Sequence, residues 1–173
     1  MPNGIIVFGA NGSGKSTIAR ELADVLNYKH MDIEAYHFIE SVIPYTKART
    51  REECLNLMLE DINKHKNFVL SAVTGDFDDE IESMYSFAVL LVAPLEIRID
   101  RVKRRAFMQH GERVSEGGDM YKQHLDFVEF VRRRTSDRIA QWKAKLKCPV
   151  ITIDSTKPIS ENIELIVQEY LHL

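Results

Sequence analysis

The sequence predicts a three-layer α/β fold, in which a five-stranded parallel sheet has helices on both faces. Three observations lead to this prediction. Apolar runs of strand length alternate with amphipathic stretches of helix length along the 173 residues, as in parallel sheets with crossover helices. The apolar runs are continuous, as expected of strands covered on both faces. A glycine-rich turn joins the first run to the first helical stretch.

The strands are expected at short, mostly apolar runs that are separated by longer helical stretches. Because successive parallel strands need a crossover between them, a helix is expected after each strand. A candidate that is less apolar than the others, Tyr28–Met31, leads into Asp32. The other four predicted strands are Ile5–Phe8, Phe68–Val73, Phe87–Ala93 and Val150–Ile153.

The helices are expected where apolar residues recur at helical spacing. Ser16–Leu26 is an example, with Ile18, Leu22 and Val25 near one face. The highly charged region Asp119–Leu146 is expected to form one or two helices. The remaining predicted helices are Arg51–Lys64, Leu95–Phe107 and Ser160–Leu171.

Composition and charge are those of a single globular domain. The hydrophobic fraction is 45% and the charged fraction 28%, which is enough apolar content for a core. The formal net charge of −3 argues against a dedicated nucleic-acid binder, which usually carries a basic excess. Cys54 and Cys148 are far apart in the sequence, so they are expected to be reduced thiols without a zinc site. We expect a cytoplasmic monomer or homodimer without a membrane partner.

The turn after the first strand has the pattern of a phosphate-binding loop. Residues 9–16 read GANGSGKS and fit G-x-x-x-x-G-K-[S/T] between a strand and a helix. The glycines allow successive backbone N–H groups to point at an anion, and the helix adds a positive N-terminus. A coincidental turn is the alternative, but the motif and both flanks agree. The predicted nucleotide-binding residues of the loop are Gly9, Ala10, Asn11, Gly12, Ser13, Gly14, Lys15, Ser16 and Thr17.

Lys15 and Ser16 have different expected roles within this loop. The Lys15 ammonium would bridge the β- and γ-phosphates of a nucleoside triphosphate, which makes it a candidate catalytic residue. The Ser16 hydroxyl would be a ligand of Mg²⁺. The loop therefore predicts a nucleoside triphosphate and Mg²⁺ as cofactors.

Three further segments of the sequence have patterns that bear on function. VAPLEIRIDRVKRRA, at Val92–Ala106, reads as a strand, a Pro-x-Glu turn and an arginine-bearing helix. VITIDSTKPI lies at Val150–Ile159, and HMDIEAY at His30–Tyr36. Together with the loop, these segments resemble the adenylate kinase and shikimate kinase group of small P-loop kinases. The resemblance implies one P-loop NTPase domain over residues 1–173, an acceptor-binding insertion at 33–66, a short lid at 106–122, and ATP as the nucleotide.

The arginines of the lid helix suit phosphoryl transfer, because the protein must neutralise the charge of the γ-phosphate oxygens. The resemblance implies that Arg101 lies over the adenine ring and that Arg104 or Arg105 reaches the phosphates. Arg101 and Arg105 are therefore candidate catalytic residues. The alternative is a solvated basic face, paired with the nearby carboxylates Glu96 and Asp100.

Two other segments are implied to contact the nucleotide. Lys157 and Pro158 lie in the segment that resembles the adenine-side loop. The related kinases also place a phosphate-binding arginine after the lid. Consecutive residues of a helix point in different directions, so one of Arg132, Arg133 and Arg134 is expected to do this, and the sequence does not say which.

Asp32 is the candidate catalytic carboxylate on the acceptor side. It follows a predicted strand, at the edge where an α/β sheet places ligands, and the shikimate and gluconate kinase relatives have an acidic residue at this position. Asp32 is expected to hold a Mg²⁺-bound water or to accept a proton from the acceptor hydroxyl. A helix N-cap is an equal alternative for Asp32, and Glu34 is the second choice.

The segment LSAVTGDF, at Leu70–Phe77, departs from adenylate kinases. Ser71 stands where that group has an aspartate, so either Asp32 or Asp76 is the candidate replacement for this carboxylate. The departure weakens the case for AMP as the acceptor. Cations after Glu34 are expected to contact an anionic acceptor, with scattered surface charge as the alternative. The predicted acceptor-binding residues are Asp32, Glu34, Arg49, Arg51 and Asp76.

These residues predict a small-molecule kinase that uses ATP and Mg²⁺. It would transfer the γ-phosphoryl group to a small, anionic or nucleotide-like acceptor, which the sequence does not identify. One alternative is a P-loop NTPase that hydrolyses or senses ATP to regulate a macromolecular partner. A third interpretation, phosphorylation of RNA or DNA ends, is disfavoured by the net charge, so nucleic acid is not an expected partner.

Overall fold

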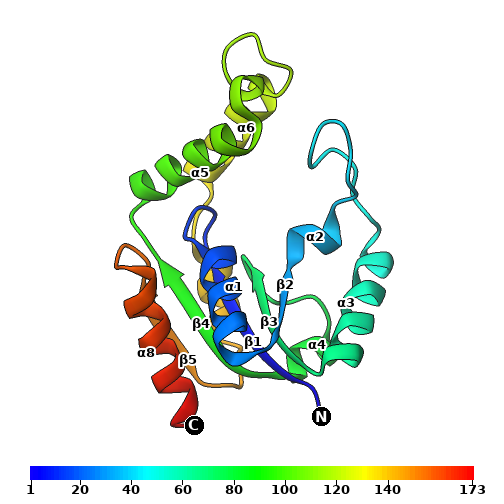
Figure 1. Ribbon diagram of the computed structural model, residues 1–173, viewed down its shortest axis with the longest axis vertical. Coiled ribbons are helices and arrows are strands. Elements are labelled where there is room, and N and C mark those ends of the chain that lie inside the picture. The colour runs from blue at the N-terminus through cyan, green and yellow to red at the C-terminus, as the bar shows by residue number, and fades with distance from the viewer.

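Five parallel strands form the central layer of the structure, a computed structural model that describes residues 1–173 (Figure 1). They are β1 (Asn3–Gly9), β2 (Lys29–Asp32), β3 (Asn67–Ala72), β4 (Tyr85–Val92) and β5 (Val150–Asp154). The strand order is β2-β3-β1-β4-β5, and every neighbouring pair is parallel. β1 is the central strand, with β2 and β3 on one side of it and β4 and β5 on the other. Open α/β sheets bind ligands at the carboxyl ends of the strands where the strand order reverses in this way.

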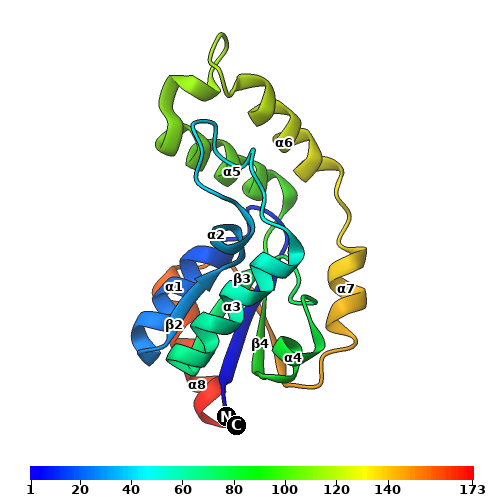
Figure 2. The same ribbon diagram turned by 90° about the vertical axis from the view of Figure 1, so that its right-hand side faces the viewer.

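Helices cover both faces of this sheet. They are α1 (Lys15–Leu26), α2 (Ile33–His37), α3 (Arg51–His65), α4 (Asp79–Ser83), α5 (Leu95–His110), the 3₁₀-helix η1 (Gly111–Val114), α6 (Tyr121–Arg133), α7 (Asp137–Lys143) and α8 (Ile159–Leu171). Buried residues of α1 and α8 pack on one face, and those of α3 and α7 pack on the other. The two layers of helices are visible on either side of the strands in Figure 2.

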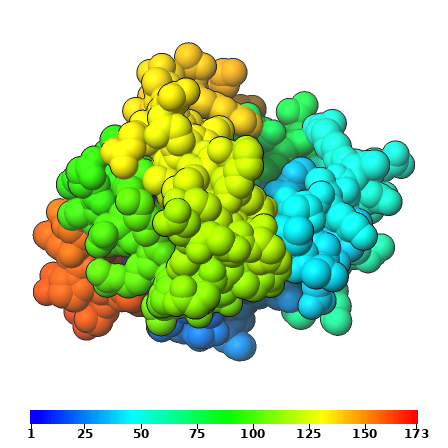
Figure 3. All heavy atoms as spheres, turned by 90° about the horizontal axis from the view of Figure 1, so that it is seen from above, coloured from blue at the N-terminus to red at the C-terminus, as the bar shows by residue number.

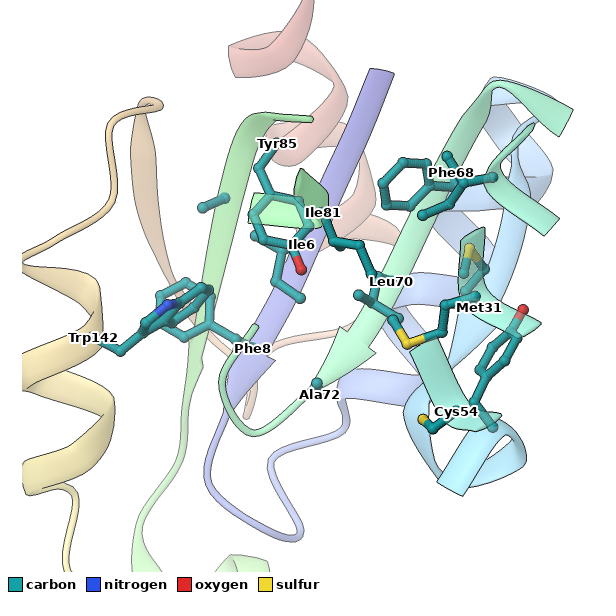
Figure 4. Packing of buried hydrophobic residues seen from close by; sticks show 14 of the residues in the cluster. Ile6, Phe8, Met31, Cys54, Phe68, Leu70, Ala72, Ile81, Tyr85 and Trp142 are labelled. Atoms are coloured by element: carbon teal, nitrogen blue, oxygen red, sulfur yellow. The ribbon is translucent and has the colours of Figure 1, made fainter. Parts of the chain in front are cut away.

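The alternation of side chains along β1 explains why the strand is apolar throughout. Ile5 and Val7 point to the face covered by α1 and α8, whereas Ile6 and Phe8 point to the opposite face. All four side chains are fully buried. Figure 4 shows the second of these faces, where the Phe8 ring meets the Trp142 ring of α7 edge to face, with centroids 5.0 Å apart. A strand buried on both faces needs apolar residues at every position, which is why the run is continuous.

The five-stranded parallel sheet with helices on both faces is confirmed by this structure. All five predicted strands form, although β4 begins at Tyr85, two residues before its predicted start. The predicted helical region 119–146 is two helices, α6 and α7. They separate at Arg134, whose ψ of 124° is extended, and the Thr135 hydroxyl then donates to Asp137 at 2.9 Å. Such local side-chain bonds compete with helix continuation.

Two short helices were not among the predicted helices, although the N-cap alternative for Asp32 pointed to the first of them, α2. Each has five residues, which is too short for a helical period to be recognised. An aspartate caps each of them: Asp32 Oδ1 accepts from the Glu34 amide at 3.1 Å, and Asp78 Oδ1 from the Glu80 amide at 2.9 Å. Their sequence signal is therefore the cap rather than the hydrophobic pattern.

The helices α5 and α6 form a separate small core above the carboxyl edge of the sheet. Ile99 and Val102 of α5 are buried against Val128 and Val131 of α6, and these four residues do not join either cluster of the sheet. Figure 1 shows the pair projecting beyond the strands. The residues predicted as a lid, 106–122, comprise the end of α5, η1, the loop after it and the start of α6.

A loop that we call the strap, residues 38–48, projects from the core between α2 and α3. Its ends pair through the backbone: the Ile39 amide donates to the Lys47 carbonyl oxygen at 2.8 Å. Seen from above, the lid residues lie against the strap (Figure 3). Arg113 Nη2 donates to the Val42 carbonyl oxygen, and Gln123 Nε2 to that of Pro44, both at 3.0 Å.

Not all of the predicted insertion 33–66 projects from the core. α3 lies within those bounds, and Cys54, Met58 and Ile62 of this helix are buried in the larger cluster of the sheet. The part that leaves the core is therefore the strap and its junctions. None of the helices has both the length and the apolar character needed to span a bilayer.

Replacement of Leu22 by alanine tests the packing of α1 on the sheet. Leu22 is fully buried, whereas Val25 of the same helix is 60% exposed. Leu22→Ala should lower the free energy of unfolding by about 2–5 kcal/mol, because a buried cavity forms. Val25→Ala, the matched control, should change it by less than about 0.5 kcal/mol. Urea unfolding measures both, and equal losses would contradict this packing.

Candidate functional site

The loop between β1 and α1 turns its carbonyl groups toward α5. Arg98 Nη1 donates to the Asn11 carbonyl oxygen at 3.2 Å, and Arg101 Nη1 to those of Gly12 and Ser13 at 3.5 and 3.4 Å. Because a trans peptide directs its C=O and N–H oppositely, the amides that follow Asn11 and Ser13 point away from α5. The amides that donate to no acceptor within the chain include those of Gly12, Gly14, Lys15, Ser16 and Thr17.

Gly12 and Gly14 are required by this arrangement. Gly12 has a φ of 79°, and a Cβ added to it would lie 2.4 Å from the Arg98 carbonyl oxygen. Gly14 has a φ of 90° and occupies the N-cap position of α1. Both φ values lie in a region that side chains other than glycine rarely adopt. The free amides and the N-terminus of α1 together form a cradle for an anion.

The Lys15 side chain folds back over this cradle. Its ammonium donates to the Ala10 carbonyl oxygen at 3.0 Å. Desolvation lowers the pKa of Lys15 to about 8. Among the nearby charges, Glu34 and Asp32 raise it, whereas Arg105 and Arg134 lower it further. Lys15 therefore supplies a positive charge that titrates close to neutral pH.

A cavity of about 470 Å³ lies on the α5 and α8 side of the loop. Arg101 forms one wall, and its guanidinium donates to the Ser155 carbonyl oxygen at 2.6 Å and to the Ser155 hydroxyl at 3.1 Å. Arg101 thus connects the phosphate loop, α5 and the loop after β5. Lys157 also lines this cavity, but Pro158, at the N-cap position of α8, does not. The size and place of the cavity suit the base and sugar of a nucleotide.

A smaller polar cavity of about 80 Å³ lies on the opposite side of the loop. Lys15, Ser16 and Thr17 line it from α1, Asp32 lines it from the end of β2, and Glu34 lines it from α2. Hydroxyl and carboxylate oxygens are the donors that Mg²⁺ prefers, and Mg²⁺ usually needs only one or two protein ligands beside phosphate and water. Ser16 and Asp32 therefore fit a magnesium site.

Asp32 both caps α2 and lines this polar cavity, so the two interpretations of this residue are compatible. Oδ1 accepts from the Glu34 amide at 3.1 Å, which orients the carboxylate. Asp32 pairs with Ser71 in the register of β2 and β3, and Ser71 is buried. The hydroxyl of Ser71 approaches the Met31 carbonyl oxygen at 3.5 Å. The Asp32 carboxylate therefore lies beside the position of the missing strand carboxylate.

The two candidate arginines of α5 have different environments. Arg104 pairs with Asp100 at 3.4 Å, and its side chain is 75% exposed. Arg105 lines the small polar cavity together with Lys15 and Asp32. At about 100° per residue, Arg105 lies about 40° from Arg101 around the helix, whereas Arg104 lies about 60° away on the other side. Arg105 is therefore the one that faces the cradle, although Arg104 also borders the larger cavity.

The three consecutive arginines at the end of α6 are also distinguished by their partners. Arg132 pairs with Glu96 at 3.3 Å, and Arg133 pairs with Glu129 at 2.6 Å. Arg134 Nη1 instead donates to the Asn11 side-chain oxygen of the phosphate loop at 3.3 Å. Desolvation, and then Arg138, lower the pKa of Arg134. Of the three, Arg134 is the one positioned to act at the loop.

The structure does not bring all of the predicted acceptor-binding residues together. Arg49 lines the open cleft beside Glu34, but its Nη1 donates to two carbonyl oxygens of α2 and to that of Phe38 in the strap, at 2.9–3.1 Å. Arg51 Nη2 donates to the Phe77 carbonyl oxygen at 2.5 Å and lines no part of this cleft. Asp76 pairs with Arg138 of α7 at 3.1 Å and is likewise not among the lining residues. Only Asp32 and Glu34 of the predicted set line the small polar cavity.

Several residues around the loop and the strap had no single predicted role. Arg98 precedes Arg101 by three positions, so helical spacing was the available signal. For Arg134 the signal was incomplete, because no pattern distinguished it from its neighbours. Nothing local marks the aromatic Phe38 and Tyr45 of the strap, which line a cavity with the lid.

Comparison with known proteins adds an independent line of evidence. Residues 5–122 match the family described as AAA domain. YqaC of Bacillus subtilis strain 168 is 29% identical over 181 residues, covering 99% of this chain and 98% of that protein. A cytidylate kinase of Haloarcula marismortui is 30% identical over 159 residues, covering 80% of this chain and 81% of the relative.

A solved structure is similar over the whole length. The shikimate kinase of Bacteroides thetaiotaomicron matches with a TM-score of 0.61 and 19% identity, covering 100% of both chains. At this level of identity the likeness shows the fold alone. It agrees with the parallel five-stranded sheet and the loop after its central strand.

The lowered pKa of Lys15 predicts that ATP binding depends on pH. The ammonium attracts phosphate only when protonated, so affinity should fall as the pH rises through a pKa of about 8. The dissociation constant for ATP should rise about tenfold between pH 7 and pH 9, because the protonated fraction falls by that factor. Calorimetric titration measures it. Lys15→Met should bind weakly at every pH, and a flat profile for the unchanged protein would contradict the assignment.

Replacement of the post-lid arginines one at a time tests their assignment. Arg134→Gln should weaken ATP binding about tenfold, as expected for loss of a hydrogen bond to a charged group. Arg132→Gln and Arg133→Gln remove the same charge but break only exposed ion pairs, so each should change affinity less than about twofold. Calorimetry with ATP compares the three variants. A larger effect from either neighbour would refute the choice of Arg134.

Proposed function

We propose that this chain, which belongs to the AAA-domain family and to the small P-loop kinases, transfers the γ-phosphoryl group of ATP to a small-molecule acceptor. Family membership rests on the match over residues 5–122 and on the likeness to cytidylate kinase, and it confirms the predicted resemblance. The fold of the solved shikimate kinase agrees with it. We propose ATP as the nucleotide, Mg²⁺ as the metal and phosphoryl transfer as the reaction.

One observation supports transfer rather than simple hydrolysis. The small polar cavity beside the phosphate loop shares Glu34 and Arg105 with a cavity of about 300 Å³ between the strap and the lid. A molecule in this strap–lid cavity would lie directly beside the phosphate bound in the cradle. Closure between strap and lid also limits the access of water, which otherwise competes for the phosphoryl group.

In the proposed transfer, some residues bind the phosphate groups and another accepts the proton of the acceptor. An acceptor hydroxyl oxygen forms a bond to the γ-phosphorus while the bond from that phosphorus to the β–γ bridging oxygen breaks, and ADP leaves. Lys15, Arg105 and Arg134 face the charge that develops on the phosphate oxygens. The hydroxyl proton passes to the Glu34 carboxylate. Desolvation and the neighbouring Asp32 raise the pKa of Glu34, which makes it a stronger base.

Asp32 is assigned the role of the carboxylate that is missing from β3. It lines the polar cavity with Ser16 and lies beside Ser71 in the sheet, whereas Asp76 is paired with Arg138. Ser16 and Asp32 would hold Mg²⁺, which when bound neutralises phosphate charge. Arg101 and Lys157 would contact the base and sugar in the larger cavity.

The exchange Glu34→Gln tests the proposed proton acceptor. Acceptor-dependent release of ADP should fall by about 10²–10⁴-fold, the usual effect of removing a general base. ATP affinity should be unchanged or tighter, because a negative charge near the phosphates is lost. A coupled ADP assay over nucleosides, nucleotides, gluconate and shikimate provides the measurement, with exposed Glu52→Gln as the matched control.

The same assay separates transfer from the alternative of an NTPase. A kinase should release ADP faster when its acceptor is added, and the phosphorylated acceptor should appear in equal amount. If ADP forms at one rate with every acceptor and with none, phosphotransfer is wrong. A nucleotide-dependent complex with a macromolecule would then support the NTPase.

A further inference from the structure

The strap–lid cavity has walls from two parts of the chain that are distant in sequence. Phe38 and Tyr45 contribute from the strap, and Val114, Met120 and Phe127 from η1, the loop after it and α6. These side chains make the cavity mostly apolar and aromatic. At about 300 Å³, it is at the lower end of the range for small-molecule sites.

The charges of this cavity are few and lie at its boundary with the phosphate site. Glu34 and Arg105 are its only acidic and basic residues apart from histidines, and both also line the phosphate side. Of the histidines, His124 has a pKa lowered by desolvation and then by Lys103, which disfavours a positive charge on its ring. Arg49 and Arg51 do not line the cavity. For a phosphate or carboxylate inside it, Arg105 is the only lysine or arginine among the lining residues.

This distribution disfavours the anionic acceptor that the sequence led us to expect. Burial of a charged group without a paired partner is strongly unfavourable. Arg105 faces the same polar cavity as Lys15, where the ATP phosphates are proposed to bind. The part of the acceptor that enters the strap–lid cavity is therefore uncharged.

The aromatic side chains indicate a planar ring. The rings of Phe38 and Tyr45 meet at 76° with centroids 5.3 Å apart, and Phe127 belongs to the opposite wall, on α6. Tyr45 has a φ of 64°, which is uncommon for a residue other than glycine and recurs at ligand-binding sites. Aromatic walls bind flat heterocycles by stacking with little dependence on their charge.

Gln123 supplies a polar group with a defined hydrogen-bonding role. Its Nε2 donates to the Pro44 carbonyl oxygen at 3.0 Å, which identifies the other amide atom as the oxygen, because only the nitrogen can donate to a carbonyl. That oxygen, Oε1, is buried and has no hydrogen-bond partner. Gln123 also lines the cavity. A buried acceptor without a partner is costly, and a ligand that donates a hydrogen would satisfy it.

From these observations we propose that the acceptor is an uncharged, amino-substituted heteroaromatic ring that carries a hydroxyl group, the chemistry of an amino nucleoside. The ring lies between the strap and α6, its amine donates to Gln123 Oε1, and its hydroxyl reaches Glu34. The hydroxyl, rather than a phosphate, receives the phosphoryl group: its oxygen bonds to the γ-phosphorus, ADP leaves, and its proton passes to Glu34. This inference rests on the proposed function.

Binding measurements on matched ribosides test the ring and its amine. Adenosine and purine riboside differ only in the exocyclic amine, as do cytidine and 2-pyrimidinone riboside. Calorimetry of the full chain with Mg²⁺ and a non-hydrolysable ATP analogue should show at least one amino riboside binding about tenfold tighter than its amine-free partner. Gluconate, shikimate and the 5′-monophosphates should bind more weakly than that riboside.

Two pairs of variants separate the contribution of each group. Gln123→Met should abolish the preference for the amine, whereas Gln168→Met, the same change at an exposed residue of α8, should preserve it. Tyr45→Leu should weaken riboside binding about tenfold, and Tyr45→Phe, which retains the ring, less than about threefold. Tyr45 is 45% exposed, so these replacements should leave the fold intact.

The outcomes distinguish this inference from the proposed function. If the paired ribosides bind equally or not at all, or if gluconate, shikimate or a 5′-monophosphate binds more tightly, the ring assignment is wrong while phosphotransfer to another acceptor still stands. If the amino riboside binds as expected but no acceptor accelerates ADP release, the ring assignment holds and phosphotransfer fails.

Discussion

The close approach of α5 to the phosphate loop is the contact on which the rest of the site depends. Arg98 and Arg101 donate to the loop carbonyl groups, and Gly12 has no Cβ to collide with the Arg98 carbonyl. With its carbonyl oxygens bonded on the α5 side, the loop presents amides on the other side, where an anion is attracted. The same Arg101 reaches Ser155. One side chain therefore connects the loop, the lid helix and the last loop of the sheet.

This arrangement also explains how the lid is positioned relative to the sheet. α5 and α6 bury their apolar residues against each other rather than in the clusters of the sheet. Polar contacts connect their outer surfaces to the rest of the chain: arginines bond to the phosphate loop, and Arg113 and Gln123 bond to the strap. Because hydrogen bonds exchange with water at modest net free energy, such contacts can break and reform without disturbing either core. The cavities beside the phosphate loop and the strap–lid cavity thus share α5 as a wall.

The register of the sheet places Asp32 beside Ser71. Asp32 and Ser71 are partners in adjacent parallel strands, so a carboxylate at the end of β2 occupies nearly the same region as one at the end of β3. Asp32 is also oriented by the cap of α2. Asp32 therefore lines the same polar cavity as Ser16, whereas Asp76 forms an ion pair with α7.

The sequence alone determined the fold class, the five strands and the phosphate loop, because each depends on local order: continuous apolar runs, helical spacing, and glycines next to Lys15 and Ser16. It also predicted Asp32 and Glu34 as site residues, because they lie at the end of a predicted strand and two residues after it. Only the tertiary structure separated Arg134 from Arg132 and Arg133, Arg105 from Arg104, and the cleft-facing Asp32 from Asp76. These residues are equivalent in local pattern, and they differ through partners such as Glu96, Glu129 and Arg138. The strap–lid cavity could not be predicted from the sequence either, because Phe38 of the strap and Phe127 of α6 line the same cavity only in the folded chain.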